Sequence, residues 1–224
     1  MSLSENGYEL INSFLSSEQL EAFNSELGSF ELPQSSGGIR NAQSKYHSVR
    51  SFSSSEHVLK HAARYLKGKP KFVRAILFNK TASNNWLVPW HQDITVAVSS
   101  KFSADGWGPW SEKDGVLHVQ PPVEVLNSMV TFRVHLDSTS EENGCLSVVP
   151  MSHKLGILPQ QEILEHSNAF SPVICPAPEG SALVMRPHLL HASAKGTSPT
   201  QRRVLHLEYS DYELPSEVSW AENV

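Results

Sequence analysis

The sequence has little cysteine: Cys145 and Cys175 are the only two among its 224 residues. Two cysteines without a repeated spacing exclude a disulfide framework and a cysteine-rich metal cluster. We interpret both as reduced, partly buried thiols. Basic residues are not in excess either, because the formal net charge is -5. A chain of this charge lacks the electrostatic footprint of a nucleic-acid-binding protein, so we expect no nucleic-acid partner and no anionic membrane partner.

Long apolar runs are also missing. The first seven residues, Met1 to Gly7, lack the basic start and apolar core of a secretory signal. No apolar run approaches the roughly 20 residues that span a membrane. We therefore expect a cytoplasmic protein without a membrane partner. A chain of 224 residues can bury one sizeable core, and we expect a single domain over residues 1–224.

The N-terminal part, about residues 1–70, is predicted to be helical. Ser16 and Gln19 have the spacing of a capping box, and Gly28 is placed to end the helix that follows. A second helix is predicted from about Ser54 to Lys67, with Ser53 as its N-cap. We interpret both helices as packing elements.

From Lys71 the pattern changes to short segments rich in β-branched, aromatic or alternating residues. We predict about eight strands: Phe72 to Asn79, Ile94 to Val98, Gly115 to Gln120, Met129 to Leu136, Cys145 to Val149, Ser181 to Met185, Leu189 to Ser193 and Arg203 to Tyr209. The expected fold is mainly β, a cupin-like jelly roll of the double-stranded β-helix type with flanking N-terminal helices. The segment Ser99 to Asp114 is long enough to cover the barrel mouth as a lid, and a structured surface loop is the alternative.

The stretch around His91 and Asp93 carries the clearest chemical signal. In an extended strand these two side chains project to the same face. A second imidazole from far along the chain would complete a 2-His-1-carboxylate site for Fe(II), and His191 is the candidate. His188 lies three residues earlier and is a weaker alternative, while His153 is interpreted as a structural loop histidine.

A basic pair, Arg202 and Arg203, opens the last predicted strand eleven residues after His191. A carboxylate-bearing co-substrate held deep in a barrel needs a fixed cation, and the guanidinium of Arg202 meets that need. The alternative is a solvated surface pair. If Arg202 points inward, Arg203 points to the opposite face of the strand.

Three motifs together resemble the phytanoyl-CoA dioxygenase family of Fe(II)/2-oxoglutarate oxygenases. They are Trp90-His91-Gln92-Asp93, Asn143-Gly144-Cys145-Leu146 through Pro150-Met151-Ser152-His153, and His191-Ala192-Ser193 followed by Arg202. The resemblance runs from Gly7-Tyr8 to Tyr209. It implies that His91, Asp93 and His191 are iron ligands and that Arg202 and Ser193 bind the distal carboxylate of 2-oxoglutarate. Met151 stands where the family usually has glycine, which concerns the local turn and not the metal site.

The sequence leaves the roles of several further residues open. Thr131, Arg133 and His135 alternate along one strand and are expected to line the barrel. Arg133 is a candidate contact of co-substrate or substrate, and an ion pair with Asp137 is the alternative. Trp86, Trp90 and Arg40 are weak candidates for the substrate pocket, since a tryptophan beside a strand most often serves packing.

The resulting expectation is an Fe(II)/2-oxoglutarate-dependent dioxygenase that uses O2 to hydroxylate a small organic substrate and releases succinate and CO2. Because the carboxylate of Asp93 takes the position that related halogenases leave open for chloride, hydroxylation is favoured over halogenation, and desaturation or epimerisation stays open. Two other classes remain: a cupin-like metal enzyme that does not use 2-oxoglutarate, and a non-catalytic binding protein on the same barrel.

Overall fold

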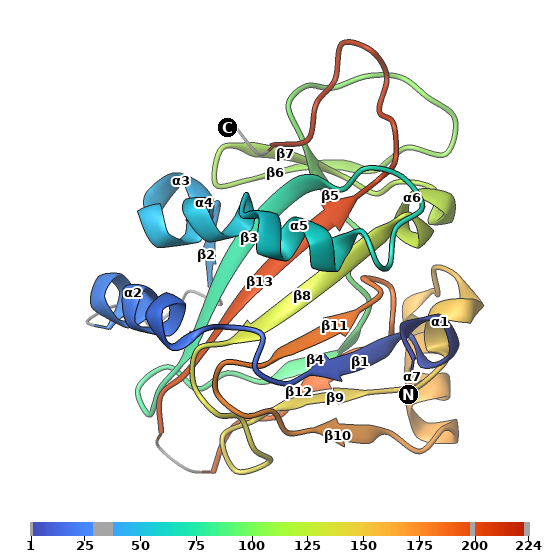
Figure 1. The fold of residues 1–224 in the computed structure, drawn as a ribbon. Coiled ribbons are helices and arrows are strands. Elements are labelled where there is room, and N and C mark those ends of the chain that lie inside the picture. Colours follow the sequence, from blue (N-terminus) through green and yellow to red (C-terminus); the bar gives the residue numbers. More distant parts are fainter. Residues whose placement is uncertain (1, 29–37, 198–199, 222–224) are drawn as a thin grey trace.

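Three antiparallel sheets form the frame of the protein in the computed structural model, which describes residues 2–28, 38–197 and 200–221 (Figure 1). The largest sheet has six strands in the order β1 (Tyr8–Ile11), β11 (Ala182–Met185), β8 (Met129–His135), β13 (Arg202–Ser210), β3 (Lys71–Lys80) and β2 (Ile39–Arg40). The second has the order β10 (Val173–Cys175), β9 (Leu146–Val148), β12 (His191–Ser193) and β4 (Val88–His91). The third has the order β5 (Val96–Val98), β7 (Val116–Val119) and β6 (Trp110–Lys113). The predicted jelly roll is confirmed.

The six-stranded sheet separates an apolar face from a polar one. Along β8 and β13 every second residue points to the N-terminal helices, and these residues join one buried cluster with helix side chains: Val130, Phe132, Val134, Leu205, Leu207, Tyr209, Phe23, Leu27, Val49 and Phe52. The residues between them point to the opposite, inner face. That inner face carries Thr131, Arg133 and His135, as the alternation along this strand predicts.

The helices gather mainly at the N-terminal end of the chain, where several lie over the outer face of the large sheet (Figure 1). Their bounds are α1 Leu3–Asn6, α2 Ser17–Leu27, α3 Ala42–Lys45, α4 His47–Ser53 and α5 Glu56–Ala62, with α6 Val123–Asn127, the 3-10 helix η1 Ser152–Leu155 and α7 Gln160–Ala169 further on. None of the helices in the described ranges combines the length and the hydropathy needed to cross a membrane.

The first predicted helix is confirmed as α2. Ser16 and Gln19 form the capping box, with Gln19 N donating to Ser16 Oγ at 3.2 Å and Ser16 N donating to Gln19 Oε1 at 2.9 Å. The second helix prediction is wrong in its bounds and its cap. Ser53 ends α4 and donates its hydroxyl to Arg50 O, whereas Ser55 has the extended backbone that lets its Oγ accept from Val58 N at the start of α5.

The segment Ser99 to Asp114 is partly a strand. Its last part forms β6, which pairs with β7. The ring of Phe102 packs on the rings of Trp107 and Trp110, with centroid distances of 4.8 and 5.4 Å. These aromatic side chains pack the segment against a buried cluster. This packing fits the structured alternative, and the lid stays a prediction.

Candidate metal centre and co-substrate cavity

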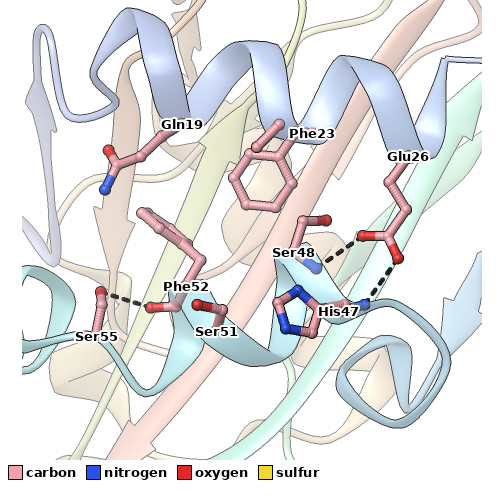
Figure 2. A pocket seen from close by; sticks show the side chains of 9 residues that line it. Gln19, Phe23, Glu26, His47, Ser48, Ser51, Phe52 and Ser55 are labelled. Carbon is pink, nitrogen blue, oxygen red and sulfur yellow. Dashed lines mark hydrogen bonds between the residues drawn. The ribbon is translucent and has the colours of Figure 1, made fainter.

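A groove of about 460 Å³ lies on the helical side of the molecule, between α2 and α4 (Figure 2). Phe23 and Phe52 line it, and the carboxylate of Glu26 accepts hydrogen bonds from the backbone N–H groups of His47 and Ser48 at 2.8 and 2.7 Å. Glu26 therefore caps α4, which lacks a side-chain cap of its own. We interpret this groove as the junction of two packed helices.

A smaller cavity of about 100 Å³ lies between the large sheet and the second sheet. It brings together all six residues that the sequence predicts as a site: His91, Asp93, His191, Ser193, Arg202 and Arg133. Phe78, Trp86, Val88 and Leu146 supply the apolar part of its wall.

The two histidines face each other across neighbouring strands. His191 of β12 is the register partner of His91 of β4, and their ring centroids are 4.1 Å apart. Asp93 lies beyond the end of β4, where its N–H donates to Pro187 O at 2.9 Å. His91 and Asp93 project into the same cavity, as expected, although β4 ends at His91 and Asp93 lies just beyond it.

Gln92, between these two residues, binds the backbone of neighbouring segments. Its Nε2 donates to Gly156 O and His188 O at 2.8 and 2.7 Å, and its Oε1 accepts from Leu158 N at 2.8 Å. The side chain thus satisfies backbone groups of the segments that surround the metal-ligand candidates. Gln92 does not line the cavity, but its side chain connects the segment of His91 and Asp93 to its neighbours.

The hydrogen atoms on the two imidazoles can be assigned from their neighbours. Nδ1 of His91 lies 2.8 Å from Pro89 O and Nδ1 of His191 lies 2.8 Å from Leu189 O. A carbonyl oxygen only accepts, so both Nδ1 atoms donate, and in the tautomer that this fixes Nε2 is the atom that can bind a metal. These Nε2 atoms lie 3.8 and 3.6 Å from the carboxylate oxygens of Asp93.

Such an arrangement of three facing acceptors fits a bound cation. The ligand atoms of His91, Asp93 and His191 all lie within 4.8 Å of one another. Burial and the neighbouring His91 lower the pKa of His191 to about 3, so its ring is neutral, as a metal ligand requires. Burial alone would raise the pKa of Asp93, but the histidines beside it hold that pKa well below its usual range. Two imidazoles and one carboxylate are the donor set of non-haem Fe(II) sites.

A cluster of cations forms the other end of the cavity. Arg202 is buried and donates from Nη1 to Gly144 O at 2.7 Å, the same oxygen that accepts from Ser193 Oγ at 2.8 Å. Lys80 donates to Ser193 Oγ at 2.8 Å and to Ala194 O at 2.6 Å. All these acceptors are neutral. Burial together with Arg202 and Arg133 lowers the pKa of Lys80 to about 7, and burial together with Arg133 lowers the pKa of Arg202 to about 10.

Lys80 was missed by the sequence analysis. The signal was the alternation of Arg74, Ile76, Phe78 and Lys80 along β3, which places these side chains on one face. That Lys80 stands opposite Arg202 depends on the pairing of β3 with β13, which joins segments far apart in the chain. Nothing local in the sequence indicates this register.

Arg133 also lines the cavity, and its charge interacts with both Asp93 and Arg202. Its Nη1 donates to His206 Nδ1 at 3.3 Å, and its guanidinium lies over the ring of Phe78 at 5.5 Å from the centroid. The alternative pairing with Asp137 is wrong, because Asp137 is bound by Arg203 on the outer face of the sheet. Arg203 therefore faces away from the cavity, as predicted.

The competing histidines lie elsewhere. Within the described residues, the group of side chains close enough to share a metal ion is His91, Asp93 and His191, and it does not include His188. His188 is fully buried, and its ring centroid is 6.2 Å from that of His153. Burial lowers the pKa of both rings, which is consistent with the structural role predicted for His153.

Of the three weak candidates for the substrate pocket, one lines the cavity and two lie elsewhere. Trp86 lines the cavity, and its ring lies 5.4 Å from Lys80 Nζ. Trp90 instead packs against a small buried cluster around Ile163, and Arg40 forms a surface ion pair with Asp114 at 3.4 Å. Met151 has a φ of 66°, in the region that favours glycine. This explains why the resembling family has glycine there.

Fold and site together define an oxygenase-like jelly roll with a candidate metal centre at one end of a cationic cavity. The chain belongs to the phytanoyl-CoA dioxygenase (PhyH) family, whose model matches residues 3–204. The resemblance seen in the sequence is thereby confirmed.

Relatives and solved structures agree with this assignment. The chain is 25% identical over 175 residues to L-proline trans-4-hydroxylase of Streptomyces griseoviridis, a match that covers 66% of this chain and 58% of that protein. Its fold is similar to AviO1 from Streptomyces viridochromogenes Tue57, with a TM-score of 0.68, 19% identity and coverage of 95% of this chain and 93% of that one. HygX from Streptomyces hygroscopicus, solved with nickel and 2-oxoglutarate bound, has a TM-score of 0.65, 15% identity and coverage of 93% and 83%.

Proposed function

We propose that the protein is an Fe(II)/2-oxoglutarate-dependent dioxygenase that hydroxylates a small organic substrate. In that reaction the substrate R–H, 2-oxoglutarate and O2 give R–OH, succinate and CO2. The observation that carries the proposal is one cavity with a His-Asp-His group at one end and buried cations at the other. Family membership supports the reaction class, and a proline hydroxylase among the relatives supports hydroxylation as its outcome.

His91, Asp93 and His191 are the proposed metal ligands. These three side chains would hold Fe(II), which would supply the chemistry that activates O2 together with 2-oxoglutarate. The hydrogen bonds from both Nδ1 atoms to backbone carbonyls fix the rings with Nε2 directed at the centre, which is how such ligands are oriented in metal sites. Asp93 completes the ligand set with a carboxylate, which favours hydroxylation over halogenation.

Arg202, Ser193 and Lys80 are the proposed partners of the distal carboxylate of 2-oxoglutarate. A buried guanidinium gives a carboxylate two parallel hydrogen bonds, and the neighbouring ammonium and hydroxyl groups offer further donors. The bonds that these groups now make to neutral oxygens leave their charges uncompensated. Arg133, nearer to the metal ligands, is the proposed partner of the other end of 2-oxoglutarate.

The test is turnover of 2-oxoglutarate by the iron-loaded protein. We would screen small amino and organic acids, beginning with L-proline, and measure succinate release and hydroxylated product. We expect one succinate for each product molecule, with no turnover after chelation of the metal and recovery when Fe(II) is restored. Metal-dependent product formation without consumption of 2-oxoglutarate would overturn the proposal. Tight iron binding without O2 consumption across the whole screen would also count against it.

A further inference from the structure

Four polar side chains form a continuous hydrogen-bonded network on the inner face of the large sheet, and it joins the proposed binding residue Arg133 to three residues outside the proposed binding set. Arg74 Nη2 donates to Glu208 Oε1 at 2.8 Å, and His206 Nε2 lies 3.0 Å from the same oxygen. His206 Nδ1 in turn lies 3.3 Å from Arg133 Nη1. Glu208 is 1% exposed and His206 is 2% exposed, so the centre of this hydrogen-bonded network is buried. The sequence analysis assigned no role to Arg74, His206 or Glu208.

The hydrogen bonds of this network run in one defined direction. A guanidinium has only donors, so Nδ1 of His206 must accept from Arg133. The hydrogen of the neutral imidazole therefore sits on Nε2, from which it is donated to Glu208. Glu208 also binds Arg74, which donates to Thr95 O at 3.0 Å, two residues beyond Asp93. One carboxylate thus fixes both the tautomer of His206 and a contact to the segment that carries a proposed metal ligand.

Arg133 is held from two sides. His206 accepts from one end of its guanidinium, and the ring of Phe78 lies against its face. The ring of Phe78 also packs edge-on against His206, at 5.9 Å between centroids and an interplanar angle of 88°. Among the described residues Nε of Arg133 has no hydrogen-bond partner, although the side chain is buried and lines the cavity. Donors of this kind are oriented before any ligand arrives.

We propose that His206 and Glu208 are positioning residues, which hold the Arg133 guanidinium in the orientation that binds the metal-proximal carboxylate of 2-oxoglutarate. The inference rests on the proposed function, since it takes 2-oxoglutarate as the occupant of the cavity. Glu208 acts through His206 and His206 acts through Arg133. The chemistry recognised is a carboxylate, and the device lowers the ordering cost of binding it.

The experiment is calorimetric titration of 2-oxoglutarate into the nickel-loaded protein, where no turnover occurs. Arg133→Gln removes the charged donor, and we expect roughly tenfold to hundredfold weaker binding. His206→Phe keeps an aromatic ring but removes the acceptor, and we expect roughly tenfold weaker binding. His206→Asn places an amide oxygen near the position of Nδ1, so it is expected to recover most of that loss. Glu208→Gln is expected to weaken binding less than His206→Phe.

A double-mutant cycle separates positioning from general packing. If His206 acts through Arg133, adding His206→Phe to Arg133→Gln costs little further affinity, whereas independent effects would add. Asp137→Asn is the matched control: it weakens a part-buried contact on the outer face of the same sheet and is expected to change thermal stability without changing the dissociation constant. Nitrogen NMR of His206 in the wild-type protein is expected to show hydrogen on Nε2.

The outcomes are distinguishable. Absence of 2-oxoglutarate binding by the wild-type protein overturns the proposed function itself. Wild-type binding with an unchanged constant in His206→Phe and Glu208→Gln overturns only the positioning role. Additive effects in the double variant, or hydrogen on Nδ1 of His206, also overturn it. If His206→Phe does not fold, Glu208→Gln takes its place in the double-mutant cycle with Arg133→Gln, and additive losses there contradict the positioning role.

Discussion

Arg202 and Arg203 are neighbours on β13, both are buried, and they differ in what surrounds their charge. Arg203 donates to Asp137 through Nε at 2.9 Å and Nη2 at 2.6 Å, and to Asn24 Oδ1 at 2.9 Å. These hydrogen bonds to Asp137 raise the pKa of the Arg203 guanidinium. Arg202 donates to a neutral carbonyl oxygen, and burial and Arg133 lower its pKa. The protein itself compensates the outer charge, whereas the inner charge is left for a ligand.

This difference extends over both faces of the large sheet. A buried charge without a partner costs several kcal/mol, so folded proteins keep one only where something offsets the cost. On the outer face, apolar packing against helices and the Arg203–Asp137 pair stabilise the fold. On the inner face Glu208 compensates Arg74, whereas Arg133, Arg202 and Lys80 repel one another around the cavity, and an anion would relieve that repulsion. Under the proposed function, ligand binding belongs to this cavity, and the Arg203–Asp137 pair on the outer face serves stability.

Removal of the Asp93 carboxylate, a proposed metal ligand, is the change with the largest expected effect. Asp93→Ala is expected to abolish turnover and to weaken Fe(II) binding by more than about a hundredfold, since even partners of metal ligands contribute 10–100-fold. The fold is expected to persist, because Asp93 is a loop residue outside the apolar clusters. Metal titration and circular dichroism measure the two effects. Unchanged turnover by the iron-loaded variant would contradict the assigned triad.

The comparison of the two arginines can be tested directly. Arg202→Ala is expected to raise the apparent Michaelis constant for 2-oxoglutarate roughly tenfold to a hundredfold, the loss of about 1.5–3 kcal/mol, with Fe(II) affinity nearly unchanged. Arg203→Ala is the matched control. It is expected to leave that constant unchanged and to lower the free energy of unfolding by about 1–3 kcal/mol. If the two variants exchange these phenotypes, the assignment of the two faces is wrong.

Lys80 adds a pH dependence to the inner face. With its pKa lowered to about 7, Lys80 loses its proton in the free protein as the pH rises through 7. A bound carboxylate favours the protonated amine, so binding takes up a proton and weakens above that pH. We expect roughly fivefold weaker binding at pH 8 than at pH 7, within the limit of tenfold per pH unit. Lys80→Met is expected to flatten this slope; an equal slope in the variant would exclude Lys80 as its source.

The smallest expected effect is that of a substitution at Met151, which belongs to neither face of the large sheet. It is expected to change stability alone. Met151 adopts a positive φ of 66° and its side chain is half exposed. Met151→Gly removes the strain of that conformation and gives up little buried surface, so we expect a gain of up to about 1 kcal/mol in unfolding free energy. Chemical denaturation measures it, with the Michaelis constant for 2-oxoglutarate unchanged. A loss of stability would mean that the Met151 side chain contributes more packing than its exposure indicates.

Local patterns in the sequence predicted much of this site. The motifs around His91 and His191 identified the triad candidates, and strand alternation placed Arg202 and Arg203 on opposite faces. Lys80, His206 and Glu208 were missed because their roles depend on which strands pair and in what register, and no local pattern records that. The single domain and the cytoplasmic location stay predictions of the sequence.

Tertiary contacts also explain what the sequence could not show in the helical region and around the metal-ligand candidates. The cap of α4 comes from Glu26 on α2, so the sequence just before α4 carries no start signal. Gln92, between His91 and Asp93, binds backbone groups of two distant segments. In both cases a side chain from one segment satisfies the backbone of another, and periodicity does not predict such contacts.

The most direct test of the account is a crystal structure of the full chain with nickel and 2-oxoglutarate. It is expected to show the metal bound by Nε2 of His91, Nε2 of His191 and a carboxylate oxygen of Asp93, with the distal carboxylate of 2-oxoglutarate paired to Arg202 inside the cavity. Arg203 is expected to remain on Asp137. A metal held by other side chains, or a 2-oxoglutarate carboxylate bound away from Arg202, would contradict the division of the two faces into ligand binding and stability.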